Sequence, residues 1–420
     1  MREELLHILW KTKKLDFSDL LTTQGEKVII QNFGIHNHDA GPDFLNAKVK
    51  IGTNIWNGHI EMHLHASAWN QHKHQNNPAY NNVILHVVYT DDKTIHNENG
   101  QTIPTIILKD RIEPKLITNY ENLIAGLNWI PCANQIEKVD QSKVPFFLER
   151  LVTKRLLRKQ AQIKVLLDNS KNDWEEVLYR LLLKYLGLKV NNEAFASLAE
   201  IAPYSLLKKQ NSLMQKESLL LGQAGMLRGK EDYIIGLQKE YKHQKAKFDL
   251  KPMSGVEWKF SKLRPANFPS LRLAQLAAIY DKTPKFFSTI ISNPQLETLT
   301  ELLSVSASSY WDTHYLTNKV SPKKKKAIGK TTQHILIINV IVPLIFAYAD
   351  LIADDVLKEK AIDLLYGLPT EKNKIITQWK KHNIKVASAA QSQALLELKS
   401  DYCDKQKCLD CQIGQLILFG

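Results

Sequence analysis

Two neighbouring stretches, 34-GIHNHDAGPDFLNAKVKIG-52 and 56-WNGHIEMHLHASAWNQHKH-74, decide how the first part of the chain folds. Each contains a run in which apolar and polar residues alternate, a period that predicts a β-strand. The turn sequence Gly52-Thr53-Asn54 lies between the runs and predicts a hairpin that brings them side by side. Ten of the 14 histidines fall within residues 1–96, so the same region holds most of the potential metal ligands.

The alternation in the second run predicts one polar face and one apolar face. Glu61, His63 and His65 fall on the polar face, and Ile60 and Met62 fall on the face that is expected to enter the core. His72 and His74 follow in a polar loop, where they are either solvated or available to bind phosphate or metal. His86 interrupts an apolar strand, where a lone histidine is more often a hydrogen-bonded core residue than a ligand.

Asp43 is expected to approach Glu61 from the neighbouring strand. Counting back from the hairpin turn sets Asp43 near the level of His63 and Leu64. Strict alternation puts Asp43 in phase with the apolar side chains of its strand, so we expect a bend or bulge at Gly41-Pro42. Two carboxylates on adjacent strands repel by about 4 kcal/mol at an effective dielectric constant of about 20, unless a cation lies between them.

Pro42-Asp43, followed after 17 residues by Glu61-Met62-His63, resembles the motif of the PD-(D/E)XK nucleases. The resemblance implies an α+β protein whose first domain, residues 1–113, is an αβββαβ restriction-endonuclease-like core. It implies catalytic roles for Asp43, Glu61 and His63, with His63 in the position of the family's lysine. Asp43 and Glu61 would bind Mg²⁺ or Mn²⁺, and we expect His65 to be a further ligand. A glutamate of the first helix, Glu3 or Glu4, could add another carboxylate.

Beyond residue 113 the apolar period changes to that of α-helices, which predicts a helical domain over residues 114–400. That part of the chain resembles an uncharacterised bacterial family of unknown function. Residues 1–130 carry a formal charge of −2 and residues 131–420 carry +15, so we expect the helical domain to bind a polyanion, DNA or RNA. The expected phosphate contacts are the cations of one basic helix and of the 323-KKKK-326 loop; on the helix they are Lys154, Arg155, Arg158 and Lys159.

The end of the chain, residues 401–420, contains three cysteines in a C-x4-C-x2-C pattern. Cys403, Cys408 and Cys411 form this cluster, and Cys132 is the only other cysteine. In a protein without a recognisable secretory signal, such a cluster indicates metal binding more than disulfides. We therefore expect the four thiols to hold Zn²⁺ or an iron–sulfur cluster with a structural role.

The chain is expected to be cytoplasmic and not to span a membrane. The longest apolar segment, residues 335–349, contains Asn339 and Pro343 and is shorter than a bilayer requires, so it predicts a buried helix. The main functional hypothesis is a metal-dependent nuclease. One alternative is a nucleic-acid-binding protein built on a catalytically inactive nuclease core, and another is a zinc-dependent hydrolase that uses the 59-HIEMHLH-65 histidines. Oligomeric state leaves no signal in the sequence.

Overall fold

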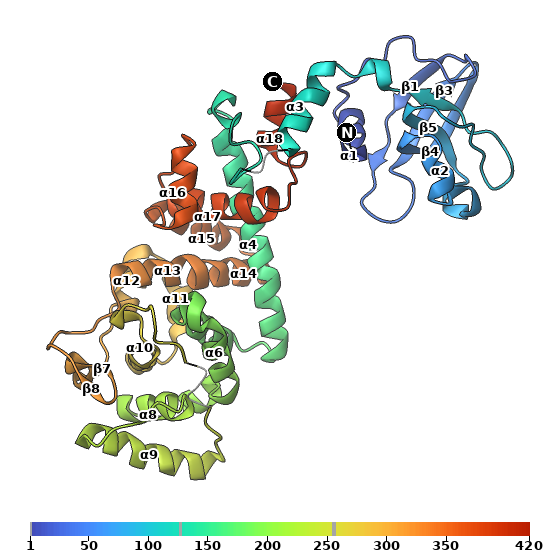
Figure 1. The fold of residues 1–420 in the computed structure, drawn as a ribbon. Helices are drawn as coiled ribbons and strands as arrows, with labels where there is room; N and C mark the ends of the chain where they lie inside the picture. The colour runs from blue at the N-terminus through green and yellow to red at the C-terminus, as the bar shows by residue number, and fades with distance from the viewer. Residues whose placement is uncertain (1, 126–127, 254–257) are drawn as a thin grey trace. The chain divides into compact units, whose positions relative to one another are not determined.

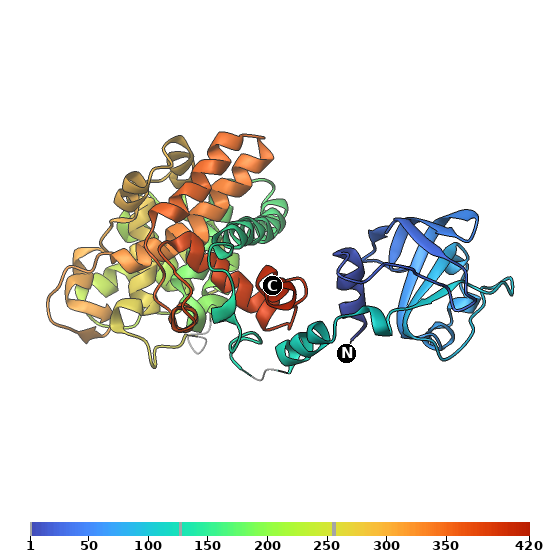
Figure 2. The same cartoon turned by 90° about the horizontal axis from the view of Figure 1, so that it is seen from above.

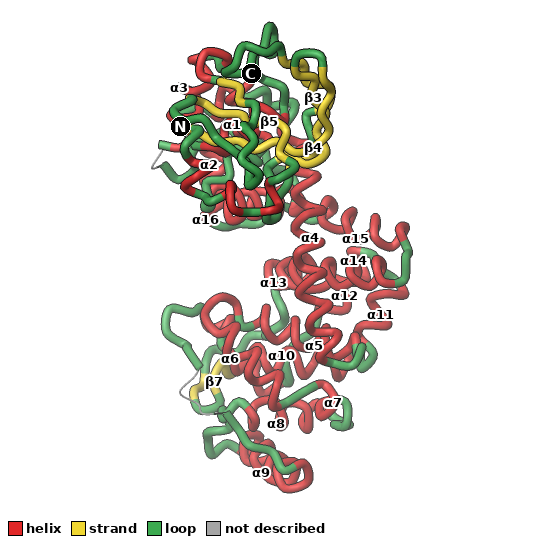
Figure 3. Tube along the Cα trace, turned by 90° about the vertical axis from the view of Figure 1, so that its right-hand side faces the viewer, coloured by secondary structure: helices red, strands yellow, loops and turns green. Residues whose placement is uncertain are grey.

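The computed structural model describes residues 2–125, 128–253 and 258–420, which fall into two compact units. The first unit comprises Met1–Phe147, Lys381–Ile384 and Leu398–Gly420, and the second comprises Leu148–Lys380 and Lys385–Glu397. Strands gather in the first unit, and helices dominate the second (Figures 1 and 3). The protein is therefore α+β, with an N-terminal mixed sheet and a mainly helical body.

The first unit is built around a sheet in the strand order β1-β3-β4-β5-β6, with β2 paired to β3. Neighbouring strands are antiparallel from β1 to β4 and parallel from β4 to β6. A parallel pair needs a crossover connection, and a short helical segment provides it between β4 and β5. The elements are α1 (Glu3–Lys11), β1 (Val28–Asn32), β2 (Ile35–His36), β3 (Phe44–Ile51), β4 (Asn54–His65), α2 (Ala68–Gln71), η1 (His74–Asn76), η2 (Pro78–Tyr80), β5 (Val83–Thr90) and β6 (Thr105–Ile107).

The β3–β4 hairpin forms where the sequence predicts it. Gly52 has a φ of 57° in the turn, a left-handed conformation that glycine adopts without strain. Gly58 in β4 is needed for a different reason, because a Cβ there would lie 2.4 Å from the carbonyl oxygen of Asn82. Together these two glycines let β4 turn back on β3 and also approach the start of β5 closely.

The two faces of the sheet bury different sets of side chains. Phe44 and Ile60 are paired across β3 and β4, and the Phe44 ring lies near Trp10 of α1. On the other face the α2 segment covers an apolar cluster that includes Trp69, Tyr80 and Val88. Glu61 and His63 lie between Ile60, Met62 and Leu64 in β4, so alternation turns them away from the α1 face.

The remaining elements of the first unit come from distant parts of the sequence. Helix α18 packs against α3 and η4, and α3 and α18 lie side by side in both ribbon views (Figures 1 and 2). This packing brings the last cysteines of the chain to the segment that contains Cys132. The elements are η3 (Lys109–Arg111), α3 (Pro114–Ile124), η4 (Ile136–Lys138), the π-helical segment η9 (Leu398–Cys403) and α18 (Gln412–Phe419).

The second unit is a helical bundle with α10 and α5 at its centre. Nearly all of α10 is buried, and α5 packs against both α10 and α13. The elements are α4 (Val144–Asn169), α5 (Trp174–Leu186), α6 (Leu188–Ile201), α7 (Tyr204–Leu207), α8 (Leu213–Gln223), α9 (Asp232–Phe248), η6 (Pro265–Asn267), α10 (Pro269–Lys282), α11 (Phe286–Ser292), α12 (Leu296–Leu303), η7 (Ser309–Thr313), β7 (His314–Leu316), β8 (Lys319–Val320), α13 (Lys330–Leu336), η8 (Ile337–Ile341), α14 (Val342–Leu351), α15 (Asp355–Gly367), α16 (Lys374–Lys381) and α17 (Ala389–Glu397).

The apolar segment near residue 340 forms one continuous helix, Lys330–Leu351, which is longer than its apolar core suggests. Its middle turn, η8, is π-helical and lies just before Pro343, which has no backbone N–H to donate. Among the described residues this is the one helix with the length and hydropathy of a membrane span. Two thirds of its most apolar window, 67%, is buried inside the protein, as in a core helix.

Candidate metal centre

Asp43 and Glu61 are held side by side by reciprocal hydrogen bonds. The backbone N–H of Asp43 donates to Glu61 Oε2 at 3.1 Å, and the backbone N–H of Met62 donates to Asp43 Oδ2 at 2.9 Å. Phe44 pairs with Ile60, so the next position outward sets Asp43 opposite Glu61. The two carboxylates that the sequence singled out therefore meet at the end of the β3–β4 pair.

A bulge in β3 produces this alignment. The register between β3 and β4 shifts between Phe44 and Ala47, and Asn46 has a φ of 57° inside the strand. The bulge keeps Phe44 on the core face and turns Asp43 off it. The expectation that Asp43 lies level with His63 was therefore wrong by two residues. The phase changes at Asn46, four residues after Pro42 of the expected Gly41-Pro42 position, because asparagine tolerates the left-handed conformation.

Helix α1 adds two more potential ligands to Asp43. Glu3 and His7 are four residues apart and therefore share one face of the helix. One ligand atom each from Glu3, His7 and Asp43 lies within 4.8 Å of the others, and His7 Nε2 is 3.3 Å from Asp43 Oδ2. The i, i+4 spacing was the signal for His7, but only the docking of α1 on the sheet shows that it faces Asp43.

A second group consists of three histidines next to Glu61. His63 comes from β4, and His72 and His74 come from the segment after α2; their ligand atoms also lie within 4.8 Å of one another. His86, on the neighbouring strand β5, contacts His63 with its Nε2 2.8 Å from His63 Nδ1. The "HKH" sequence was the signal for His72 and His74, which the turn at Lys73 (φ 61°) aims back toward β4.

His65 stays apart from this cluster. Its side chain is exposed and its Nδ1 lies 2.8 Å from the hydroxyl of Thr90. The strand twists and ends at His65, so the residue that alternation places on the same face as Glu61 and His63 reaches the surface instead. The structure therefore joins Asp43, Glu61 and His63, and it replaces His65 by His72 and His74.

Burial controls the protonation of the site. Burial, and then the charge of Asp43, raises the pKa of Glu61 to about 9, and the same two causes raise the pKa of Glu3. Burial, followed by the neighbouring His86 and His74, lowers the pKa of His63 to about 3. The site thus combines acids that disfavour their charged form with a histidine that is neutral at physiological pH. A cation bound there would stabilise the carboxylates and accept the imidazole lone pairs.

All four cysteines belong to the first unit. Beyond burial, the neighbouring thiols Cys408 and Cys411 contribute to a raised pKa of Cys132, and Cys132, Cys408 and Cys411 contribute to a raised pKa of Cys403. Burial raises the pKa of Cys132 and of Cys411 to about 12. The backbone N–H groups of Ile413 and Gly414 donate to the sulfur of Cys411, which would stabilise a thiolate there.

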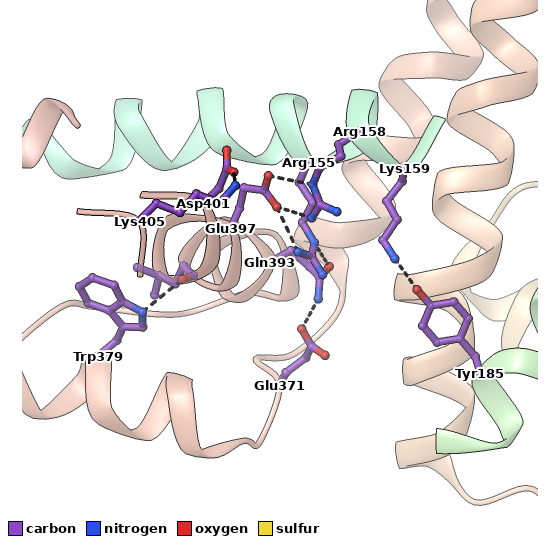
Figure 4. Close-up of polar contacts among 11 residues, drawn as sticks. Arg155, Arg158, Lys159, Tyr185, Glu371, Trp379, Gln393, Glu397, Asp401 and Lys405 are labelled. Atoms are coloured by element: carbon purple, nitrogen blue, oxygen red, sulfur yellow. Dashed lines mark hydrogen bonds and ion pairs between the residues drawn. The ribbon is translucent and has the colours of Figure 1, made fainter. Parts of the chain in front are cut away.

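The predicted basic helix forms as α4, but its cations are largely engaged within the second unit. Figure 4 shows Arg155 and Arg158 pointing toward Glu397 of α17, at 3.3 Å and 2.6 Å. Lys159 donates to the hydroxyl of Tyr185, and burial, with the charges of Arg155 and Arg158, lowers the Lys159 pKa to about 8. Lys154 lies on the exposed side of the helix. Arg155, Arg158 and Lys159 thus bind α4 to its neighbours, which leaves little of their charge for a phosphate backbone.

The fold and this site define a class of protein: a mixed sheet carrying a carboxylate–histidine cluster, joined to a basic helical unit. A family model described as "Protein of unknown function (DUF2851)" matches residues 3–374, so the chain belongs to that family. No curated protein and no solved structure matches the chain.

Proposed function

We propose that the protein is a metal-dependent nuclease that hydrolyses phosphodiester bonds of DNA or RNA. The observation that carries this proposal is the pairing of Asp43 and Glu61, fixed by the two reciprocal hydrogen bonds at the end of the β3–β4 hairpin. A divalent ion bound there would polarise a phosphoryl oxygen and supply a hydroxide at neutral pH. Asp43, Glu61 and Glu3 are the oxygen ligands that suit Mg²⁺ or Mn²⁺.

The order of elements in the first unit supports a restriction-endonuclease-like core within this proposal. A helix precedes three antiparallel strands (β1, β3 and β4), and a helical crossover leads to β5, which is parallel to β4. This is an αβββαβ order, with the short strand β2 inserted between β1 and β3. The acidic pair lies at the hairpin of the second and third strands, the position that the motif implies.

His63 is the residue that separates the proposal from its alternative. Its side chain is 1% exposed and bonded to His86, and its lowered pKa keeps it neutral, so it does not replace the permanent charge of a lysine. In the nuclease it would serve as a metal ligand, with Asp43 and Glu61. The alternative is a nucleic-acid-binding protein on an inactive core, and the loss of the motif's cation is the observation that favours it.

The test is cleavage of labelled single- and double-stranded DNA and RNA in Mg²⁺ or Mn²⁺. Asp43→Asn and Glu61→Gln keep the shape of each side chain and one accepting oxygen but remove the charge. We expect both to reduce cleavage at least 100-fold, because each removes an anionic ligand of the ion. Asp39→Asn is the matched control, since Asp39 is an exposed carboxylate in the same loop, and this variant should cleave like the wild type.

Salt-sensitive binding without cleavage, in the wild type and in both variants, would overturn the nuclease proposal. It would support the nucleic-acid-binding alternative, because phosphate contacts persist without a catalytic ion. Cleavage that survives in Asp43→Asn would also contradict the role of Asp43 as an anionic ligand of the catalytic ion.

We propose separately that Cys132, Cys403, Cys408 and Cys411 hold a structural metal, either Zn²⁺ or an iron–sulfur cluster. The cysteines come from two distant parts of the sequence, and α18, which follows Cys411, packs on η4, which begins four residues after Cys132. Gly414 supports this arrangement, because a Cβ there would lie 2.1 Å from the carbonyl oxygen of Cys408. A thiolate-bound ion would fasten the last stretch of the chain to the turn around Cys132.

A further inference from the structure

We propose that the site binds two metal ions, with His63, His72, His74 and Glu61 forming the second position. The first position is the Glu3, His7 and Asp43 group. Glu61 lies between them, with Oε2 facing Asp43 and Oε1 facing the histidines. This inference deepens the proposed function, on which it rests for the role of the Asp43–Glu61 pair, and it adds a nitrogen-rich position to that oxygen site.

The distances among the four ligand atoms fit one ion. His63 Nε2 lies 3.1 Å from His72 Nδ1 and 3.6 Å from Glu61 Oε1, and His74 Nε2 lies 3.3 Å from the same oxygen. An ion with four ligands at about 2.1 Å in tetrahedral geometry separates those ligands by about 3.4 Å. These three distances lie close to that value, and one ligand atom each from His63, His72 and His74 lies within 4.8 Å of the others, so the group is near the spacing that an ion requires.

The burial of His74 is an independent observation that supports an ion at the second position. The residue is 8% exposed, yet its Nε2, which faces Glu61, has no hydrogen-bond partner among the described residues. Buried polar atoms nearly always have a partner, and a bound ion is one explanation for an exception.

Neighbouring side chains hold the rings of His63 and His74 in place. His63 Nδ1 contacts His86 Nε2 at 2.8 Å, which leaves His63 Nε2 facing the proposed ion. Tyr80 stacks on His74 with ring centroids 3.8 Å apart, and Trp69 meets it edge-on at 5.2 Å. Metal-binding histidines are commonly oriented by a hydrogen bond from the other ring nitrogen, and this support limits the movement of the ligands.

The ligand chemistry indicates which ions suit the second position. Three imidazoles and one carboxylate favour Zn²⁺, Mn²⁺ or Fe²⁺ over Mg²⁺, which prefers oxygen and water. A carboxylate shared between two ions about 4 Å apart is typical of centres that hydrolyse phosphate esters. Two positions of different composition would let one ion remain bound while the other follows the substrate.

The experiment counts Mn²⁺ ions bound per chain in the full-length protein by equilibrium dialysis and electron paramagnetic resonance. Mn²⁺ is chosen because the soft cysteine thiolates bind it poorly. We expect two ions in the wild type and one in His72→Ala, which removes an exposed ligand without opening the core. Glu3→Gln should also bind one ion, and the control His65→Ala should bind two.

The count distinguishes this inference from the proposed function. One ion in the wild type, unchanged in His72→Ala, would overturn the second position while cleavage assays still test the nuclease. Two ions in the wild type, one in His72→Ala and no cleavage of any substrate would support the second position and contradict the nuclease. A thermal melt of His72→Ala that matches the wild type shows that the lost ion reflects a lost ligand.

Discussion

Asn46 is a single residue on which the geometry of the site depends. Its φ of 57° lies inside β3, and the bulge around it turns Asp43 off the core face and toward Glu61. A β-branched residue is strained in this conformation by about 1–2 kcal/mol, whereas glycine adopts it freely. The bulge therefore depends on a residue that contacts neither carboxylate.

Replacing Asn46 should separate backbone strain from the asparagine side chain. We expect Asn46→Val to lower the free energy of unfolding by about 1–2 kcal/mol and to weaken Mn²⁺ binding, because the strand loses its bulge. Asn46→Gly should keep both properties within about 0.5 kcal/mol. Denaturant unfolding and dialysis measure the two effects, and equal losses in both variants would show that the side chain matters instead.

The cysteines lead to a second expectation at the residue scale. Cys132→Ser and Cys411→Ser should each lose the bound zinc or iron and lower the melting temperature by about 5–10 °C, as the loss of a structural metal predicts. Elemental analysis identifies the metal, and visible absorption distinguishes an iron–sulfur cluster from zinc. A strong chelator should destabilise the wild type but not the variants; a variant that retains its metal would contradict this assignment.

Helices α4 and α17 are joined by an ion cluster around the buried carboxylate of Glu397. Arg155 and Arg158 both bond Glu397, whose side chain is fully buried. Burial alone would raise the pKa of Glu397, but the hydrogen bond and charge of Arg158, with Arg155, lower it below its ordinary value. An acid with a lowered pKa in the folded state stabilises the protein above about pH 4.5, and this stability is lost as the pH falls further.

Glu397→Gln should therefore lower the free energy of unfolding at pH 7 by about 3 kcal/mol, because it leaves two guanidinium groups without their counter-ion. The difference from the wild type should shrink as the pH falls below about 4.5 and through the lowered pKa of Glu397. Glu359→Gln replaces an exposed acid on α15 and should change stability by less than about 0.5 kcal/mol. A difference that stays constant from pH 7 to pH 3 would contradict the assigned ion cluster.

The elements were largely predictable because their apolar periods are strong. The hairpin around Gly52 forms where it was expected, and the basic helix that carries Lys154 to Lys159 forms as α4. The exact pairing of Asp43 was not predictable, because one left-handed asparagine shifts the register. The approach of His72 and His74 to β4 was not predictable either, because it depends on the path of the turn at Lys73. Glu397, the partner of Arg155 and Arg158, lies about 240 residues away in the sequence, and no local pattern reveals such a pair.

Charge is the property of the whole molecule that bears on nucleic acid. Residues 131–420 carry +15, yet the structure uses part of this charge internally. Lys326 of the predicted basic loop is 5% exposed, and its ammonium donates to the carbonyl oxygen of Asp312. Lys323, Lys324 and Lys325 remain exposed, so the loop offers three cations instead of four.

If the protein binds nucleic acid through this loop, replacing Lys323, Lys324 and Lys325 by alanine should weaken binding and flatten its salt dependence. Each lost phosphate contact lowers the slope of log affinity against log salt by about 0.9. A triple alanine variant of the exposed lysines of α9, Lys242, Lys245 and Lys247, changes the net charge equally and is the control. Equal effects in both triple variants, measured by fluorescence anisotropy, would show that net charge alone governs binding.

The division into two units also determines the order in which they can be completed during translation. The chain leaves the first unit after Phe147 and returns to complete it with Leu398–Gly420, after nearly all of the second unit has been made. At 5–20 residues per second a ribosome needs between about 10 and 50 s to cover that interval. During this time Cys132 has been synthesised, whereas Cys403, Cys408 and Cys411 have not. The newborn protein therefore passes through a period in which oxidation can reach a sulfur that the finished protein buries.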